Sequence, residues 1–276
     1  MKTSALVRFR QRTLFVLSLT SAISASGFLW PFIFNAQSVS LASIFFWSAS
    51  AFAIVLLIIE ISNESLDAKS IALLGVLTAI VAALRPLGAG AVGIEPMWFV
   101  LILSARVFGS SFGFILGITS ILTSALLTGG IGPWLGYQLF AAGWIGLFAG
   151  WLPKKIRGKP EIFLLVLYAI AASFIFGLLM DLQFWPWALG LETQLSYIPN
   201  GDIATNLNRF FVFHFATSMA WDIPRAILTS SLIILTAPSI LGALRRTKFR
   251  AAFVTPIEFV DSKNAAIERA KELKAI

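Results

Sequence analysis

Long, unbroken apolar runs dominate this sequence and limit what it can fold into. Residues 13–34, 41–61 and 161–182 are almost entirely apolar, and each has roughly the 20 residues that a helix needs to cross a bilayer. Strands of a membrane barrel would instead alternate apolar and polar residues over shorter stretches. Only 12% of the residues are charged, against about 25% in soluble domains. The sequence therefore predicts an all-α integral membrane protein.

The basic residues set the expected number of spans. Lys69 and the basic cluster at 154–159 flank apolar runs, as cytoplasmic residues do under the positive-inside rule. An even number of crossings must separate them, so residues 95–127 are expected to form two short helices that break near Gly109. Both termini are then cytoplasmic. Eight spans are expected, at residues 13–34, 41–61, 70–87, 95–108, 112–127, 134–152, 161–182 and 208–237.

The sequence lacks the motifs of catalysis and of ATP hydrolysis. It has no Cys and one His, His214, so it predicts neither a disulfide nor a metal cluster. No G-x-S-x-G, H-E-x-x-H or P-loop motif is present, and these carry the common nucleophile, zinc and nucleotide sites. No nucleic-acid recognition motif accompanies the net charge of +8, so nucleic acid is not an expected partner. We expect no enzyme activity, and any active transport must draw its energy from another subunit.

Small residues form a stripe on the expected helix at 70–87. Gly75, Ala79 and Ala83 are four residues apart, so they share one helical face on which another helix can pack closely. The stripe either docks a partner protein or packs inside the same bundle. Spacing alone favours internal packing.

Three expected outer segments carry glycines, aromatics and polar residues. RPLGAGAVGIEP is bracketed by Arg85 and Glu95, and it is either a lid or a flexible turn. TGGIGPWLGYQ, residues 128–138, places Trp134 and Gln138 on one face at the start of a helix. The segment after residue 182 contains Trp185, Trp187 and Tyr197, which have a ligand-binding role or anchor the chain at the membrane interface.

One pair of opposite charges falls inside an expected span. Asp222 and Arg225 are three residues apart in MAWDIPRAIL, so we expect them to pair and to face the bundle interior. Pro224 between them cannot donate a backbone hydrogen bond and favours a kink. No other ionisable residues are expected well inside the membrane, which argues against a pump or a proton-coupled carrier.

The chain resembles a known family in the order of its motifs. The matching pieces are ALLGVLTAIVAALRP, TGGIGPWLGYQLFAAGWIGLFAG, FGLLMDLQFWPW, LSYIPNG and NLNRFFVFHFATSMAWDIPRA. They resemble the substrate-binding S component of energy-coupling factor (ECF) vitamin transporters, in particular the actinobacterial cobalamin-specific type. The resemblance implies a six-helix core at residues 67–246. Residues 1–66, with two extra membrane helices, and the tail at 247–276, an amphipathic helix or a solvated tail, lie outside it.

The resemblance also implies partners, a ligand and a site. The stripe of Gly75, Ala79 and Ala83 would dock on the transmembrane coupling protein, and two ABC ATPases would supply energy in the bacterial plasma membrane. The chain would hold no cofactor of its own. It would bind cobalamin, or alternatively riboflavin or thiamine, near the outer face. The residues implied at that site are Arg85, Glu95, Gly129, Gly130, Trp134, Tyr137, Gln138, Trp185, Trp187, Tyr197, Asp222 and Arg225.

Two other classes of function stay open at this stage. A stand-alone secondary carrier or channel would transport substrate without ATPases. A membrane enzyme is a weaker alternative, because the sequence lacks the nucleophile and metal-ligand sets that it would need.

Overall fold

A computed structural model gives the fold of residues 11–33, 68–88, 92–132, 134–189 and 193–252, with single positions between 48 and 55. These residues form helices and connecting turns, with no strand among them. Five helices are long and apolar enough to cross a membrane, namely α1, α3, α5, α7 and α9. The elements are α1 (Gln11–Ile33), α3 (Ala68–Leu84), the 3-10 helix η1 (Arg85–Gly88), α4 (Met97–Phe108), α5 (Ser110–Thr128), α6 (Leu135–Trp151), α7 (Lys159–Ala188), α8 (Ile203–Thr217) and α9 (Met219–Ala252).

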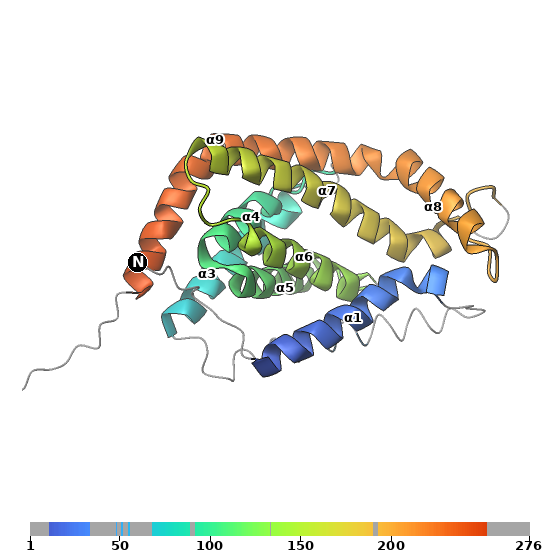
Figure 1. Cartoon of the computed structure of the whole chain (residues 1–276), viewed down its shortest axis with the longest axis horizontal. Coiled ribbons are helices and arrows are strands. Elements are labelled where there is room, and N and C mark those ends of the chain that lie inside the picture. Colours follow the sequence, from blue (N-terminus) through green and yellow to red (C-terminus); the bar gives the residue numbers. More distant parts are fainter. Residues whose placement is uncertain are drawn as a thin grey trace, which may run out of the picture.

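The short helix α4 lies at the centre of the bundle. It packs against α5, α6 and α9, and nearly all of its side chains are buried. Figure 1 shows it enclosed between the α5–α6 pair and the longer α7–α9 pair. At about 1.5 Å per residue, its 12 residues extend roughly 18 Å, less than the ~30 Å of a bilayer's hydrocarbon core. The neighbouring helices therefore screen α4 from lipid.

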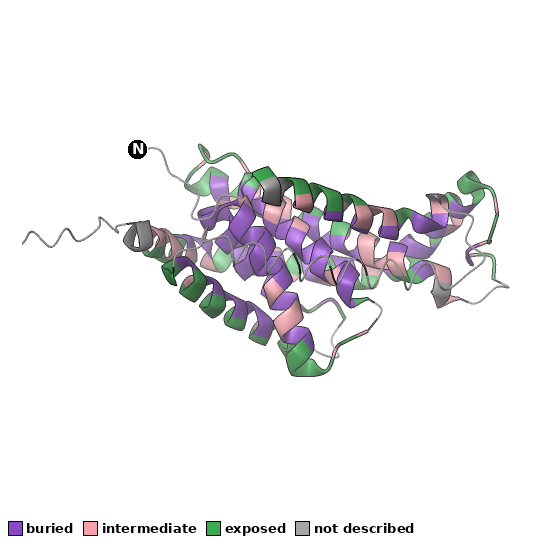
Figure 2. Ribbon diagram, turned by 90° about the horizontal axis from the view of Figure 1, so that it is seen from below, coloured by how far each residue is buried: buried purple, intermediate pink, exposed green. Residues whose placement is uncertain are grey.

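Close backbone approach holds α5 and α6 together. A Cβ atom on Gly113 would overlap the backbone of Gly146, and one on Gly146 would overlap that of Gly113. Small residues allow such contact, which gives membrane helices much of their packing energy. In Figure 2 the buried residues follow the inward faces of the helices, while exposed residues follow the outward faces.

The predicted division of residues 95–127 into two helices is confirmed. α4 ends at Phe108 and α5 begins at Ser110, with Gly109 between them at φ 106°, a backbone conformation that glycine adopts most easily. The amide of Gly109 still donates to the carbonyl of Ala105, at 2.8 Å. Because the chain reverses at this break, α5 ends at the same end of the bundle at which α4 begins.

The single last span predicted at 208–237 is wrong in its bounds. The chain forms α8 and then α9, with a tight turn at Ser218, whose carbonyl accepts from the amides of both Trp221 and Asp222. α8 begins early because Asp202 caps it by accepting from the amide of Thr205, at 3.0 Å. α9 runs to Ala252, beyond the expected core boundary at residue 246.

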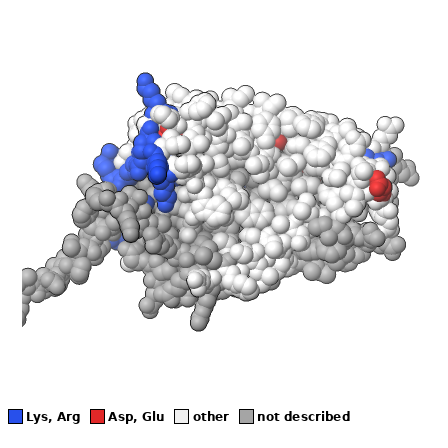
Figure 3. Space-filling view, viewed as in Figure 1, with Lys and Arg blue, Asp and Glu red and all other residues white. Residues whose placement is uncertain are grey.

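Charge separates the two ends of the bundle. In Figure 3 the Lys and Arg side chains gather at one end, around the α6–α7 loop and the last turns of α9, and the belt beside them is almost free of charge. This is the distribution that the topology prediction requires. The span predicted at 41–61 and the tail from 253 lie outside the described residues, so the count of eight spans and the position of the termini stay predictions.

Candidate functional site

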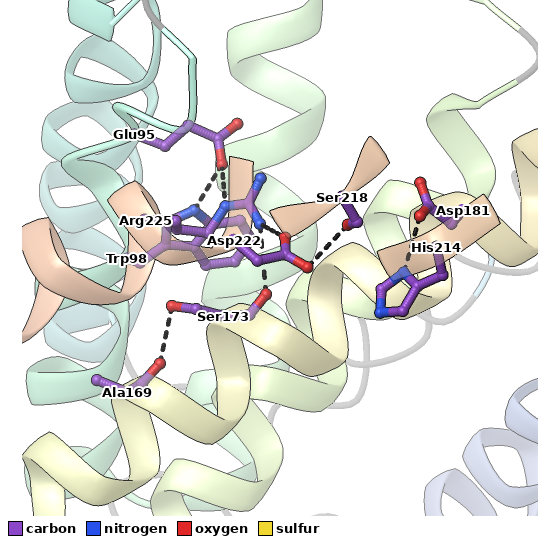
Figure 4. Close-up of polar contacts among 9 residues, drawn as sticks. All are labelled: Glu95, Trp98, Ala169, Ser173, Asp181, His214, Ser218, Asp222 and Arg225. Carbon is purple, nitrogen blue, oxygen red and sulfur yellow. Dashed lines mark hydrogen bonds and ion pairs between the residues drawn. The ribbon is translucent and has the colours of Figure 1, made fainter. Parts of the chain in front are cut away.

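Arg225 is the centre of a buried polar cluster that joins the start of α9 to α7 and to the loop before α4 (Figure 4). Its Nε lies 2.8 Å from Glu95 Oε2 and its Nη1 lies 2.6 Å from Asp222 Oδ1. Nη1 also donates to the carbonyl of Ser173 on α7, at 3.3 Å. Asp222 has no exposed surface. The predicted pairing of Asp222 with Arg225 in the bundle interior is therefore confirmed.

The loop before α4 brings Glu95 into this cluster. Gly93 has a φ of 69°, and a Cβ atom there would overlap the backbone carbonyl of Trp221. The loop therefore comes down onto the start of α9, and the indole of Trp98 donates to Glu95 Oε2 at 2.9 Å. Two donors thus hold one carboxylate oxygen, and Glu95 becomes a fixed partner of Arg225.

A second ionisable pair continues the cluster along α8. His214 Nδ1 lies 2.8 Å from Asp181 Oδ2, and Ser218 donates to Asp222 Oδ2 at 2.8 Å. Ser218 follows the helix of His214, so this bond ties the end of α8 to Asp222. Five ionisable residues therefore meet where the sequence predicted two, and the expectation that only Asp222 and Arg225 are well inside is wrong. Spacing could not show this, because Asp181 and His214 lie on different helices.

Apolar side chains replace this polar chemistry deeper in the bundle. Trp98, Ile102, Ile145, Ala169, Ala172 and Ser173 line a narrow recess that has no room even for a water molecule. Sites for drug-sized ligands usually have about 300–1,000 Å³, so this recess cannot hold a vitamin.

The predicted aromatic residues of the long outer segment are packed against α1. Trp185 is fully buried and Tyr197 is 8% exposed, and their ring centroids are 5.6 Å apart. The indole of Trp185 donates to the carbonyl of Leu195, at 2.7 Å. Burial raises the pKa of Tyr197, because the phenolate would lose hydration. The side chain of Trp187 lies outside the described residues.

The residues predicted at the α5–α6 turn have different surroundings. Gln138 accepts from Arg85 at 2.9 Å, which ties η1 to the start of α6. Tyr137 is buried against Phe28 of α1, with ring centroids 4.9 Å apart. Trp134 is 45% exposed. The sequence placed Trp134 and Gln138 on one face of the helix, but their surroundings differ. Gly129 is exposed and ends α5 at φ 66°, and Gly130 follows it.

The stripe on α3 faces outward. Gly75, Ala79 and Ala83 are exposed, and a Cβ atom on Gly75 would meet no atom within 4 Å. The opposite face packs inward through Leu77 and Val81. The stripe therefore takes no part in packing within the described bundle.

The basic end has a buried ion cluster that sequence analysis missed. Arg106 Nε lies 2.8 Å from Glu161 Oε1, and Arg245 Nη2 lies 2.6 Å from the same oxygen. Arg106 also donates to three backbone carbonyls around the α6–α7 loop, those of Leu152, Pro153 and Ile156. This network joins α4, α7 and α9. Among the described residues no group of three His, Asp or Glu side chains could hold a metal ion.

Gly177 allows α7 to approach the polar cluster. A Cβ atom at this position would overlap the carboxylate of Asp222, which Arg225 and Ser218 hold in place. We expect Gly177→Ala to lower the free energy of unfolding by about 1–3 kcal/mol, the usual cost of overpacking. Thermal unfolding of the purified protein measures this. Gly75→Ala is the matched control, and an equal loss in both variants would contradict the prediction.

Comparisons with known proteins find no matching family model, curated protein or solved structure. The described residues define the class of protein: an all-helical chain with five helices long and apolar enough to cross a membrane. They also define its distinctive feature, a buried cluster of five ionisable residues at one end. A more particular function rests on these residues and on the order of the sequence motifs.

Proposed function

We propose that this protein is the substrate-binding subunit of an ECF-type importer, with cobalamin as the first candidate ligand. The subunit captures the vitamin at the outer face of the plasma membrane. It docks through α3 on a transmembrane coupling protein, and two ABC ATPases supply the energy that releases the vitamin to the cytoplasm. Riboflavin and thiamine are alternative ligands for the same role.

The face of α3 that no other described residue covers carries this proposal. Internal packing was the main alternative role for Gly75, Ala79 and Ala83, and the exposure of all three residues argues against it. Their neighbours Val76 and Ile80 are also exposed, so the face is apolar and nearly smooth. Such a face allows a second membrane helix to come close, where van der Waals contact stabilises the pair.

The outer end of the bundle supports the proposed location of the ligand. Arg85 and Gln138 lie at one side of it, and Trp185 and Tyr197 provide aromatic surface at the other. Ligand sites commonly combine aromatic walls with a few polar groups that fix orientation. We assign Glu95, Asp222 and Arg225 to the floor of this region, where they hold α4, α7 and α9 in register.

A stand-alone secondary carrier gains support from the cluster of five ionisable residues. Proton relays in carriers use chains of Asp, Glu and His inside the membrane. The described cluster, however, ends at Ser173, and the apolar side chains of Ile102, Ile145 and Ala169 follow it. A cluster confined to one end of the bundle fits a structural or gating role better than a relay.

Direct binding tests the proposal. We expect the purified chain, without other subunits, to bind one of cobalamin, riboflavin, thiamine or biotin in isothermal titration calorimetry, with cobalamin first in order. The coupling protein and ATPases should be needed only for uptake into vesicles. Failure of all four ligands to bind would contradict the vitamin assignment, and uptake by the chain alone would favour the secondary carrier.

A further inference from the structure

We propose that the last two turns of α1, residues 27–33, are an aromatic plug that fills the outer site and leaves it when a ligand with a planar conjugated ring enters. This inference rests on the proposed function, because it concerns the same site. It assigns a role to a helix outside the six-helix core and identifies what the ligand must displace.

Aromatic contacts of α1 coincide with residues predicted to line the site. The rings of Phe28 and Tyr137 are 4.9 Å apart, and those of Trp30 and Tyr197 are 5.7 Å apart. Phe32 stacks on Trp185, with centroids 6.0 Å apart and an angle of 19° between the ring planes. Three predicted ligand contacts therefore each have a partner ring from α1. The contacts of Phe28 and Trp30 are edge-to-face, with 64° and 66° between the ring planes. A planar ligand that displaced α1 would take over these ring contacts.

The helix that carries the plug lies between α6 and the α7–α8 pair. α1 contacts α6 on one side and α7 and α8 on the other. Figure 1 shows α1 running along the lower side of α6 toward the ends of α7 and α8. Phe32 also contacts Phe210 of α8, at 6.2 Å between ring centroids. Withdrawal of these two turns would uncover surface on α6 and on α7 and α8 at once.

The sequence of the plug provides a hinge. Pro31 lies inside the helix, and it cannot donate the hydrogen bond that the carbonyl four residues earlier would accept. That residue is Gly27, which is itself a poor helix former. The two turns that carry Phe28, Trp30 and Phe32 are therefore held by side-chain contacts more than by their backbone. They can move away from the bundle, and their opening uncovers Ser24 in the turn before them.

Thiol labelling can test the plug, because the chain has no Cys. Ser24 lies one turn before Phe28 and is 1% exposed, and Ser120 on α5 is not exposed at all. Both hydroxyls are buried without a hydrogen-bond partner among the described residues. Ser24→Cys and Ser120→Cys are thus matched, nearly isosteric probes of the α1 interface and of the core. The full-length variants would react with N-ethylmaleimide in lipid nanodiscs, with labelling followed by mass.

Without ligand, we expect Ser24→Cys to label on the order of 10-fold faster than Ser120→Cys, because local opening exposes only the first. Adding Pro31→Ala to Ser24→Cys should slow labelling, since it restores the missing hydrogen bond, whereas adding Leu29→Ala on the exposed side of α1 should not. Equal rates for the two cysteines, or no effect of Pro31→Ala, would overturn the plug whether or not any vitamin binds.

Saturating ligand separates the two proposals. With whichever vitamin binds in calorimetry, labelling of Ser24→Cys should rise several-fold further, because the ligand holds the plug open, and labelling of Ser120→Cys should stay unchanged. Binding without this rise, or with protection of Ser24→Cys, would leave the vitamin function standing and overturn the plug. If no vitamin binds, the vitamin function fails, and the ligand-free comparison decides about the plug.

Discussion

Ala79→Leu or Ala83→Leu should abolish vitamin uptake by the complete transporter while leaving vitamin binding by the isolated subunit unchanged. Both alanines are exposed on the face of α3 that is left uncovered in the described part of the chain. A leucine there would hold a partner helix away from the backbone, at a cost of about 1–3 kcal/mol. Every 1.4 kcal/mol is about tenfold in affinity, so loss of up to about 100-fold in docking is expected. Uptake into proteoliposomes and calorimetry measure the two effects separately.

Ala171→Leu is the matched control for this experiment. Ala171 is an exposed alanine on α7, so the same change adds the same apolar volume to a different helix of the bundle. Uptake should stay normal in this variant. Normal uptake in both α3 variants would show that the stripe does not dock a partner, and loss of vitamin binding in them would show that α3 shapes the ligand site instead.

Arg225→Gln should destabilise the protein by about 3–5 kcal/mol, the cost of leaving a buried charge without its partner. The guanidinium neutralises Asp222 and Glu95 and lies 5.0 Å from the ring centroid of Phe176. Without the guanidinium, the carboxylates of Glu95 and Asp222 would both lose their counterion. Chemical denaturation in detergent micelles measures the difference in unfolding free energy.

A double variant separates the ion pair from general damage. Asp222→Asn combined with Arg225→Gln removes both charges of the closest pair, so it should be more stable than the sum of the single changes predicts. Arg246→Gln, at an exposed position of α9, should change stability by less than about 0.5 kcal/mol. Additive losses in the double variant would contradict a direct coupling between Asp222 and Arg225.

Sequence patterns predicted the features that depend on neighbours along the chain. The break at Gly109 followed from the positive-inside rule, and the pairing of Asp222 with Arg225 followed from their separation of three residues in a helix. The loop between Arg85 and Glu95 was recognised by its glycines, and it does fold onto the bundle through Gly93. Each of these features depends on the geometry of neighbouring residues or on the basic residues that flank an apolar segment.

Features that depend on contacts between distant helices were not predictable. Nothing in the spacing of Asp181 and His214 indicates that α7 and α8 bring them together. Nothing in the sequence near Arg106 indicates that its side chain turns inward to Glu161, where it also donates to carbonyls of the α6–α7 loop. The packing of α1 on Tyr137, Trp185 and Tyr197 likewise needs the three-dimensional arrangement.

The central position of α4 has a consequence for how the protein is made. A helix of 12 residues with Arg106 in its last turn is too short and too polar to be stable alone in lipid. It should enter the membrane only as a hairpin with α5. Glu95 then has no counterion until α9, the last described helix to be synthesised, brings Arg225 into the bundle. Completion of the polar cluster is therefore coupled to the synthesis of α9, and chains that stop before α9 should be recognised by membrane quality control as unfinished.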